Sequence, residues 1–270
     1  MRIITLLTDF GLRDGYAGVL KGVIWQHAPQ VQIVDLSHDI APQNVLEGTL
    51  ALERCAPYFP PGTIHLAAVD PGVGTDRLPL AADLGGFYFV GPDNGLITTL
   101  VRLARRQGIV PRFFHLNQKQ FWLPEVSNSF HARDIFAPVA AHLANGVPLE
   151  QLGSPLKDAV IFEIPMPSPK DEGWRGEIIH IDHFGNLATN LRSNHLAAFT
   201  NVHIHVGEYT IRNLSPAYHS NARGDLIAMI DSAGYLAICV VDGSAADFVQ
   251  AKVGDPVEVH ITTSPSLLPS

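Results

Sequence analysis

The sequence is poor in cysteine and has no long hydrophobic run. Its 270 residues include only two cysteines, Cys55 and Cys239, which lie far apart in apolar surroundings. We therefore expect two buried free thiols rather than a disulfide. No hydrophobic run has the length of a membrane span, and the first segment, MRIITLLTDF, reaches an acidic residue too early for a signal peptide. These absences predict a cytoplasmic protein whose first segment is a core strand.

Positive charge is also scarce. Lysine and arginine number 18 against 26 aspartates and glutamates, the formal net charge is -8, and no lysine- or arginine-rich run occurs. Because nucleic-acid binding depends on neutralising phosphates, this balance argues against a nucleic-acid partner. It argues more weakly against an anionic membrane surface. We expect neither nucleic acid nor a membrane as a partner.

Several motifs that indicate a known chemistry are missing. The chain has no HExxH, no paired cysteines, no GxSxG, no Walker loop and no well-placed GxGxxG. Either His38 with Asp39, or the segment from His131 to Asp134, could supply metal ligands, but neither has a recognised ligand spacing. We therefore expect no metal site.

Alternating strand and helix patterns fill residues 1–164. Apolar runs of strand length occur at 3–7, 31–36, 63–69, 78–83 and 87–90, and helical patterns occur after Asp14, at 45–56, at 96–106 and after His131. Asp14 and Asn44 stand where helix caps are expected, and the glycines of the first helix are expected to allow close packing against the sheet. The alternation predicts an α/β domain with a mainly parallel sheet.

The pattern of hydrophobic residues changes after this domain. Residues 165–173 contain three prolines among polar residues and predict an extended linker. The helical period then fades, and short strand patterns follow at 176–182, 202–206, 209–213, 226–230, 236–241 and 257–262. We expect residues 174–270 to form a smaller all-β domain, a barrel or a sandwich.

The strand predicted at 63–69 runs into an acidic residue at its carboxyl end. Asp70 is followed by Pro71, which ends sheet pairing, and by Gly72 and Gly74, which let a ligand approach the backbone. Ligands of α/β sheets bind beyond the carboxyl ends of strands. Asp70, Arg77 and His131 could therefore form an acid–base set. The residues alone equally allow an acidic turn, a surface arginine and a structural histidine.

Two other segments carry candidate binding residues. Asp9 and Asp14 flank a glycine-containing turn and could hold ribose hydroxyls or an ammonium group, although Asp14 could equally be a plain helix cap. Phe184 beside Asn186 suits a flat heterocycle, with a ring to stack on it and an amide to bind its nitrogens. A simple β-turn would explain the same residues.

Five segments together resemble one known family. They are TDFG at 8–11, VDPGVGT at 69–75, GPDNG at 91–95, SFHARDIFAP at 129–138 and IDHFGNLATN at 181–190. Over nearly its whole length the chain is similar to the S-adenosyl-L-methionine (SAM) hydroxide adenosyltransferase family, which also includes fluorinase and chlorinase enzymes. The resemblance implies an N-terminal α/β domain, a C-terminal β-barrel and a homotrimer, with each active site between one subunit's N-terminal domain and its neighbour's C-terminal domain.

The resemblance also implies a reaction and a catalytic set. Water or hydroxide would attack C5′ of SAM and release adenosine and L-methionine, with no cofactor. The family's Asp-Arg-His set maps onto Asp70, Arg77 and His131. In the hypothesis that follows, Asp70 orients or deprotonates the water. Arg77 favours its hydroxide form, and His131 fixes the arrangement or relays the proton.

The implied substrate contacts come from both domains. The residues are Asp9 for the ribose diol, Asp14 for the methionine end, Ser129 at the reacting centre, Asp182 for the methionine amino group, Phe184 and Asn186 for adenine, Ser232 for the methionine carboxylate, and also Gln43 and Asn94. Three positions depart from the fluorinases: Gln43 replaces a tryptophan beside the ribose, Ala233 an arginine near the carboxylate, and Val241 an asparagine near the adenine.

The same comparison bears on the nucleophile. The halogenases carry an extra loop in the first domain, whereas here Gly91–Gly95 leads directly into a helix, and Ala132 stands where a hydroxyl residue helps to desolvate halide. Water is therefore the expected nucleophile. A halogenase of the same fold, a non-catalytic SAM- or adenosine-binding protein and a metal-dependent hydrolase remain alternatives.

Overall fold

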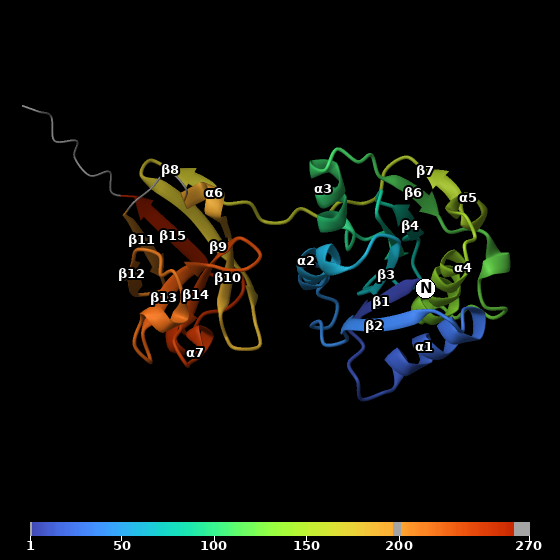
Figure 1. The fold of residues 1–270 in the computed structure, drawn as a ribbon, viewed down its shortest axis with the longest axis horizontal. Coiled ribbons are helices and arrows are strands. Elements are labelled where there is room, and N and C mark those ends of the chain that lie inside the picture. Colours follow the sequence, from blue (N-terminus) through green and yellow to red (C-terminus); the bar gives the residue numbers. More distant parts are fainter. Residues whose placement is uncertain (1, 197–200, 262–270) are drawn as a thin grey trace, which may run out of the picture. The chain divides into compact units, whose positions relative to one another are not determined.

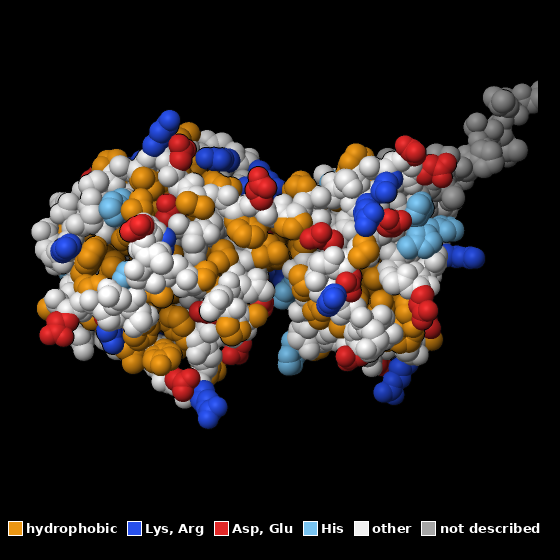
Figure 2. Space-filling model, turned by 180° about the vertical axis from the view of Figure 1, so that it is seen from behind, with side chains coloured by type: hydrophobic (Ala, Val, Ile, Leu, Met, Phe, Trp, Pro, Cys, Tyr) orange, Lys and Arg blue, Asp and Glu red, His pale blue; other side chains and the backbone are white. Residues whose placement is uncertain are grey.

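The computed structural model describes residues 2–196 and 201–261, and the chain divides into two compact units between Glu163 and Ile164 (Figure 1). We call them the N-terminal and C-terminal units. Within the described residues, no helix is both long enough and apolar enough to span a membrane. On the face shown in Figure 2, acidic and basic side chains are interspersed with apolar ones over both units.

The N-terminal unit is built on one seven-stranded sheet. Its strands are β1 (Ile3–Thr8), β2 (Gln32–Ser37), β3 (Thr63–Ala68), β4 (Pro79–Asp83), β5 (Phe87–Pro92), β6 (Arg112–His115) and β7 (Ser154–Leu156), in the order β2-β1-β3-β5-β4-β6-β7. The strands β2, β1, β3 and β5 are parallel to one another, whereas β4, β6 and β7 pair antiparallel. The prediction of a mainly parallel sheet is not confirmed, because the sheet is mixed. The short β4–β5 connection makes a hairpin, and a hairpin can join only antiparallel strands.

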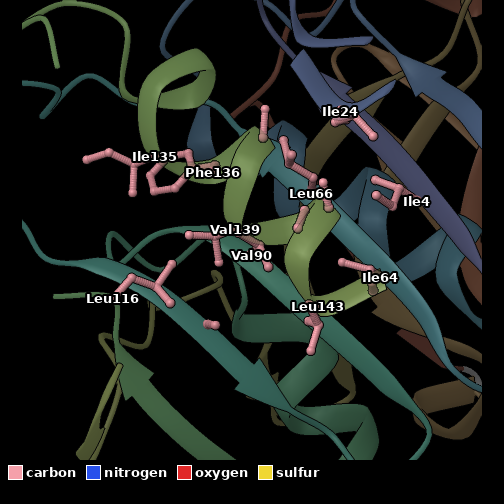
Figure 3. Close-up of a cluster of buried hydrophobic side chains, with 14 of the residues drawn as sticks. Ile4, Ile24, Ile64, Leu66, Val90, Leu116, Ile135, Phe136, Val139 and Leu143 are labelled. Atoms are coloured by element: carbon pink, nitrogen blue, oxygen red, sulfur yellow. The ribbon is translucent and has the colours of Figure 1, made fainter. Parts of the chain in front are cut away.

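Helices cover both faces of this sheet. The main helices are α1 (Tyr16–His27), α2 (Val45–Cys55), α3 (Thr98–Arg106) and α4 (Ala137–Ala144), with the shorter turns η1 (Ala56–Tyr58), η2 (Lys119–Phe121), η3 (Ala132–Phe136) and α5 (Leu149–Leu152). The helices α1 and α4 pack on the face that carries Ile4 and Leu6 of β1, and α2 and α3 pack on the face that carries Leu7. This division follows the two-residue period of a strand. Figure 3 shows the first cluster, with side chains of η3 and α4 beside those of β3.

Two local expectations for α1 are wrong. Its N-cap is Gly15, with a φ of 75° and no side-chain cap, so Asp14 does not cap the helix. Gly18 and Gly22 are exposed, and a Cβ at either position would meet nothing within 4 Å, so these glycines do not pack against the sheet. The predicted cap of α2 is confirmed, since the Asn44 side chain accepts a hydrogen bond from the Glu47 N–H.

The helix η3 is a π-helical turn that immediately follows His131 and continues into α4. Its five residues include the buried Ile135 and Phe136, which fix the turn against the core. Single π-helical turns within helices are rare and occur frequently at functional sites.

The C-terminal unit is a nearly closed antiparallel barrel. Its strands are β8 (Ser168–Lys170), β9 (Gly173–Ile181), β10 (Leu187–Arg192), β11 (Val202–Val206), β12 (Tyr209–Arg212), β13 (Leu226–Ile230), β14 (Tyr235–Val240) and β15 (Pro256–Ile261). The order is β12-β11-β15-β9-β10-β14-β13, and β8 pairs with β9. The short helices α6 (Ser193–Leu196), η4 (Tyr218–Ser220) and α7 (Ala245–Val249) lie between strands. Strand β8 falls within the stretch predicted as a linker, and Thr262, predicted to end a strand, lies outside the described residues.

A buried histidine in β3 makes the N-terminal unit sensitive to acid. His65 is fully buried, its Nδ1 lies 2.8 Å from Thr5 Oγ1, and it packs between Phe59 and Phe87. Burial lowers the pKa of His65 from 6.5 to about 4. Between pH 6.5 and pH 4 the unfolded chain binds a proton at this histidine that the folded chain does not. The free energy of unfolding is therefore not reduced by His65 above pH 6.5, and it falls as the pH approaches 4.

We expect His65 to cost the protein up to about 3 kcal/mol of unfolding free energy over this pH range. Urea unfolding at pH 7 and at pH 4.5 measures the loss in the wild type and in His65→Gln, whose side chain does not titrate. The variant should lose less stability than the wild type. Equal losses in the two proteins would show that His65 does not carry this acid sensitivity.

Candidate active site

A small cavity lies at the carboxyl ends of β1 and β3. Its volume is about 60 Å³, which accommodates a few water molecules. Its lining residues are Asp9, Phe10, Ala68, Asp70, Val73, Ser129, Phe130, His131 and Ala132. The cavity thus brings together Asp9, Asp70, Ser129 and His131, four of the residues expected at the site, from three separate segments.

Asp70, Arg77 and His131 form one connected group. Arg77 Nε lies 2.9 Å from Asp70 Oδ1 and 3.0 Å from Oδ2, and Arg77 Nη2 donates a further hydrogen bond to Oδ2. The same Nη2 lies 3.1 Å from His131 Nδ1. The side chains of Arg77 and Asp70 are only 8% and 10% exposed. Arg77 does not line the cavity itself, but it bonds two residues that do, Asp70 and His131.

The protonation of His131 follows from this geometry. Burial lowers the pKa of His131, and the positive charge of Arg77 lowers it further, against the opposing effects of Asp70 and Asp134. The ring is therefore neutral at pH 7. Because Arg77 can only donate, Nδ1 accepts its hydrogen bond and the ring proton resides on Nε2.

The loop between Asp70 and Arg77 is folded by its own short-range bonds. The Val73 N–H binds the Asp70 carbonyl, and the Thr75 hydroxyl binds the Gly72 carbonyl at 2.7 Å. Gly74 has a φ of 77°, and a Cβ at this position would lie 2.3 Å from the Asn128 carbonyl oxygen. Glycine is required here because the loop lies directly against the segment that leads to His131.

Another group of bonds holds the segment that carries Ser129 and His131. Both oxygens of the buried Asp134 are engaged, since Oδ2 accepts from the Ser127 N–H and hydroxyl at 2.9 Å and Oδ1 pairs with Arg133. The Arg133 guanidinium also lies 5.0 Å from the centroid of the Phe130 ring. No sequence pattern indicates Ser127, and the sequence indicates Asp134 only as a candidate metal ligand, because the bonds between these two residues form only when the loop is folded.

Asp9 is held by the loop that follows β2. Its Oδ2 accepts a hydrogen bond from the Gln43 N–H at 2.8 Å, and Gln43 adopts a positive φ of 65°. The Gln43 backbone is thus placed beside the cavity-lining Asp9. Asp14 is exposed and does not line the cavity. Asn94 does not line it either, and its side chain binds backbone groups instead.

The remaining expected residues lie in the C-terminal unit. Asp182 organises a turn, since Oδ1 accepts from the N–H groups of Phe184 and Asn186, and Oδ2 accepts from the Asn186 side chain. Phe184 is 73% exposed, so its ring is accessible for stacking. Asp231 organises the turn that contains Ser232 and Ala233, and its Oδ1 accepts from the Ala233 N–H.

Two residues not expected from the sequence lie near these turns. The Tyr218 hydroxyl donates to Cys239 Sγ at 3.5 Å. The hydrogen bond to Cys239 and burial raise the pKa of Tyr218, and the charges of Asp182 and Asp231 raise it further, which places both carboxylates near the phenol.

Val241 is buried, and its N–H binds the Asp225 carbonyl. Among the residues that the structure describes, no three His, Cys, Asp or Glu side chains are grouped so as to hold a metal ion.

The sequence is similar to those of several known proteins. The chain is 35% identical to the (R)-S-adenosyl-L-methionine hydrolase of Salinispora tropica over 95% of this chain and 97% of that protein. It is 38% identical to the protein of the same name from Thermus thermophilus over 96% of this chain and 100% of that one. A fluorinase from Nocardia brasiliensis is more distant, at 26% identity over 96% of this chain and 97% of its own.

Comparisons of structure and of domain families agree. The crystal structure of an uncharacterised conserved protein from Thermotoga maritima superposes with a TM-score of 0.87 and 35% identity, covering 95% of this chain and 99% of that one. Residues 4–153 match the SAM hydroxide adenosyltransferase N-terminal domain, and residues 176–258 match the C-terminal domain of the same family. The chain therefore belongs to the SAM hydroxide adenosyltransferase family.

Proposed function

We propose that this protein hydrolyses SAM to adenosine and L-methionine by attack of water at C5′. The observation that carries the proposal is the Asp70–Arg77–His131 group at a cavity with room for only a few water molecules. Membership of the family and the names of its relatives at 35% and 38% identity support the same activity.

The main task in this reaction is to position the nucleophile. The sulfonium of SAM is already a good leaving group, so its departure needs neither a general acid nor a cofactor. The water must lie in line with the C5′–S bond, which a fixed site can achieve. As a hydroxide-like oxygen approaches the sulfonium, opposite charges are neutralised, and a site with little water favours that step.

Asp70 and His131 divide the handling of this water in our proposal. The Arg77 fork fixes both oxygens of Asp70, so the carboxylate faces the cavity in one orientation and accepts the water's proton. Since Nδ1 of His131 is bound by Arg77, Nε2–H is left as a donor that holds the water oxygen. Arg77 favours the hydroxide form through its positive charge.

The rest of the substrate would be bound by residues of both units. We propose Asp9 and Gln43 for the ribose, Ser129 for the reacting centre, and Asp14 for the methionine end. The neighbouring subunit of a homotrimer would contribute the other contacts. We propose Asp182 for the methionine amino group, Phe184 and Asn186 for adenine, and Ser232 for the methionine carboxylate. The exposed Phe184 ring and the ordered Asp182 turn support this assignment.

Incubation of the purified protein with SAM in ¹⁸O-labelled water tests the proposal. We expect adenosine and methionine in equal amounts, with ¹⁸O in the 5′-hydroxyl of adenosine, and no loss of activity on chelation. Parallel reactions with chloride and fluoride should give no 5′-halo-adenosine. Tight SAM binding without adenosine above the uncatalysed background would indicate a sensor instead, and a 5′-halo product would indicate a halogenase.

A further inference from the structure

Two consecutive residues bind both ends of the loop that carries Asp70 and Arg77. Asn94 Nδ2 donates to the carbonyl of Val69, the residue before Asp70, at 2.8 Å. The backbone N–H of Asp93 donates to the carbonyl of Leu78, the residue after Arg77, at 2.9 Å. The turn after β5 therefore fixes the point where the chain enters this loop and the point where it leaves.

Each of the two side chains is itself anchored. Asn94 Oδ1 accepts from the Leu96 N–H at 3.2 Å, and Asp93 Oδ1 accepts from the Val160 N–H at 2.8 Å. Asp93 is buried, with 9% of its surface exposed. Since side chains held in this way have little rotational freedom, the turn is a rigid support rather than a passing contact.

Asp93 also acts on Arg77 electrostatically. Burial raises the pKa of Asp93, and the positive charge of Arg77 opposes that rise, so the two groups lie within electrostatic reach. Arg77 Nη1 is buried and has no hydrogen-bond partner among the described residues. The guanidinium is thus bonded to Asp70 and influenced by Asp93 without a direct bond to it.

We propose that Asp93 and Asn94 are positioning residues, which hold the two ends of the loop so that Asp70 and Arg77 form their bidentate pair beside the cavity. This inference rests on the proposed function, because the loop is catalytic only if the protein hydrolyses SAM. It replaces the expectation that Asn94 contacts the substrate. The amide oxygen and nitrogen of Asn94 are each bonded to backbone, and Asn94 does not line the cavity.

The kinetic test uses two substitutions that preserve shape. Asn94→Asp keeps the acceptor for Leu96 but loses the donor to Val69, and Asp93→Asn keeps an acceptor for Val160 but removes the negative charge. We expect kcat for SAM to fall about tenfold to a hundredfold in Asn94→Asp, with KM within about twofold, because misplaced catalytic groups slow chemistry. The fall should be smaller in Asp93→Asn, which keeps the backbone N–H that binds the Leu78 carbonyl. Asn117→Asp, at an exposed asparagine of the same unit that bonds Ser154, is the matched control and should match the wild type. A rise in KM with kcat preserved would overturn the inference and restore Asn94 as a substrate contact.

A second measurement does not depend on activity. In protein labelled with ¹⁵N-arginine, the Arg77 Nε–H, identified by its loss in Arg77→Lys, should exchange slowly with water in the wild type because it is bonded to Asp70. We expect exchange to become at least about tenfold faster in Asn94→Asp if the pair loosens. Unchanged exchange would overturn the inference even if the enzyme were active. If the wild type releases no adenosine, the proposed function fails, and this exchange measurement still decides whether the turn positions the pair.

Discussion

Replacing Asp70 with asparagine is expected to lower kcat for SAM hydrolysis by about 10²–10⁴-fold, the range typical of a lost general base. Asparagine has the same shape, and its amide oxygen can still accept a hydrogen bond from Arg77. Its amide, however, cannot take the proton of the attacking water. KM should change little, because Asp70 lines the small cavity and is not among the residues proposed to bind adenine and methionine. Initial rates of adenosine release at several SAM concentrations measure both constants.

The matched control is Asp83→Asn. Asp83 also binds an arginine, since Arg112 Nη2 lies 2.7 Å from its Oδ2, but this pair is on the surface and away from the cavity. Surface ion pairs contribute little to stability. The control should therefore stay folded and retain wild-type kinetics. A kcat in Asp70→Asn equal to that of the control would remove Asp70 from the mechanism.

The second large effect is expected for Arg77→Lys, which keeps the positive charge but removes the guanidinium that donates two hydrogen bonds in parallel. A lysine ammonium cannot hold both oxygens of Asp70 and also donate to His131 Nδ1 in the observed geometry. We expect kcat to fall about a hundredfold, the effect of misplacing a catalytic group by about 1 Å. The melting temperature reports folding separately, and its change should be too small to account for the fall in kcat.

Arg112→Lys is the matched control for this substitution. Arg112 pairs with both Asp83 and Glu150 and is 56% exposed, so losing its fork should leave the rate unchanged. If Arg77→Lys were as active as this control, positive charge alone would suffice at position 77, and the bidentate geometry would have no catalytic importance.

The elements that sequence patterns predicted well are those governed by neighbours along the chain. The apolar run 63–69 became β3, and the Asn44 cap formed because its partner is three residues away. The mixed sheet also depends on the pairing of β6 with β4, which is a long-range contact that local periodicity does not encode. Strand β10 was missed because its residues follow a glycine-containing turn that reads as a binding loop.

The candidate site divides in the same way. Asp70 and Arg77 lie seven residues apart, so their pairing was foreseeable. His131 joins them from 54 residues away. The residues alone allowed a structural histidine equally well, and the family resemblance favoured the catalytic role. The bond from Asn94 to the Val69 carbonyl crosses 25 residues, and no residue pattern predicts which carbonyl an asparagine will choose. The assignment of Asn94 to the substrate comes from the family resemblance alone.

The π-helical turn at Ala132–Phe136 limits how this protein can diverge over generations. A π-helical turn holds one residue more than an α-helical turn, and each residue of an α-helix advances the side-chain direction by about 100°. Deleting one residue within η3 while α4 stays packed would carry His131 about that far around the helix axis, away from Arg77. A single-codon deletion at this turn would therefore move the histidine out of the site without altering any of the three residues of the Asp70–Arg77–His131 group.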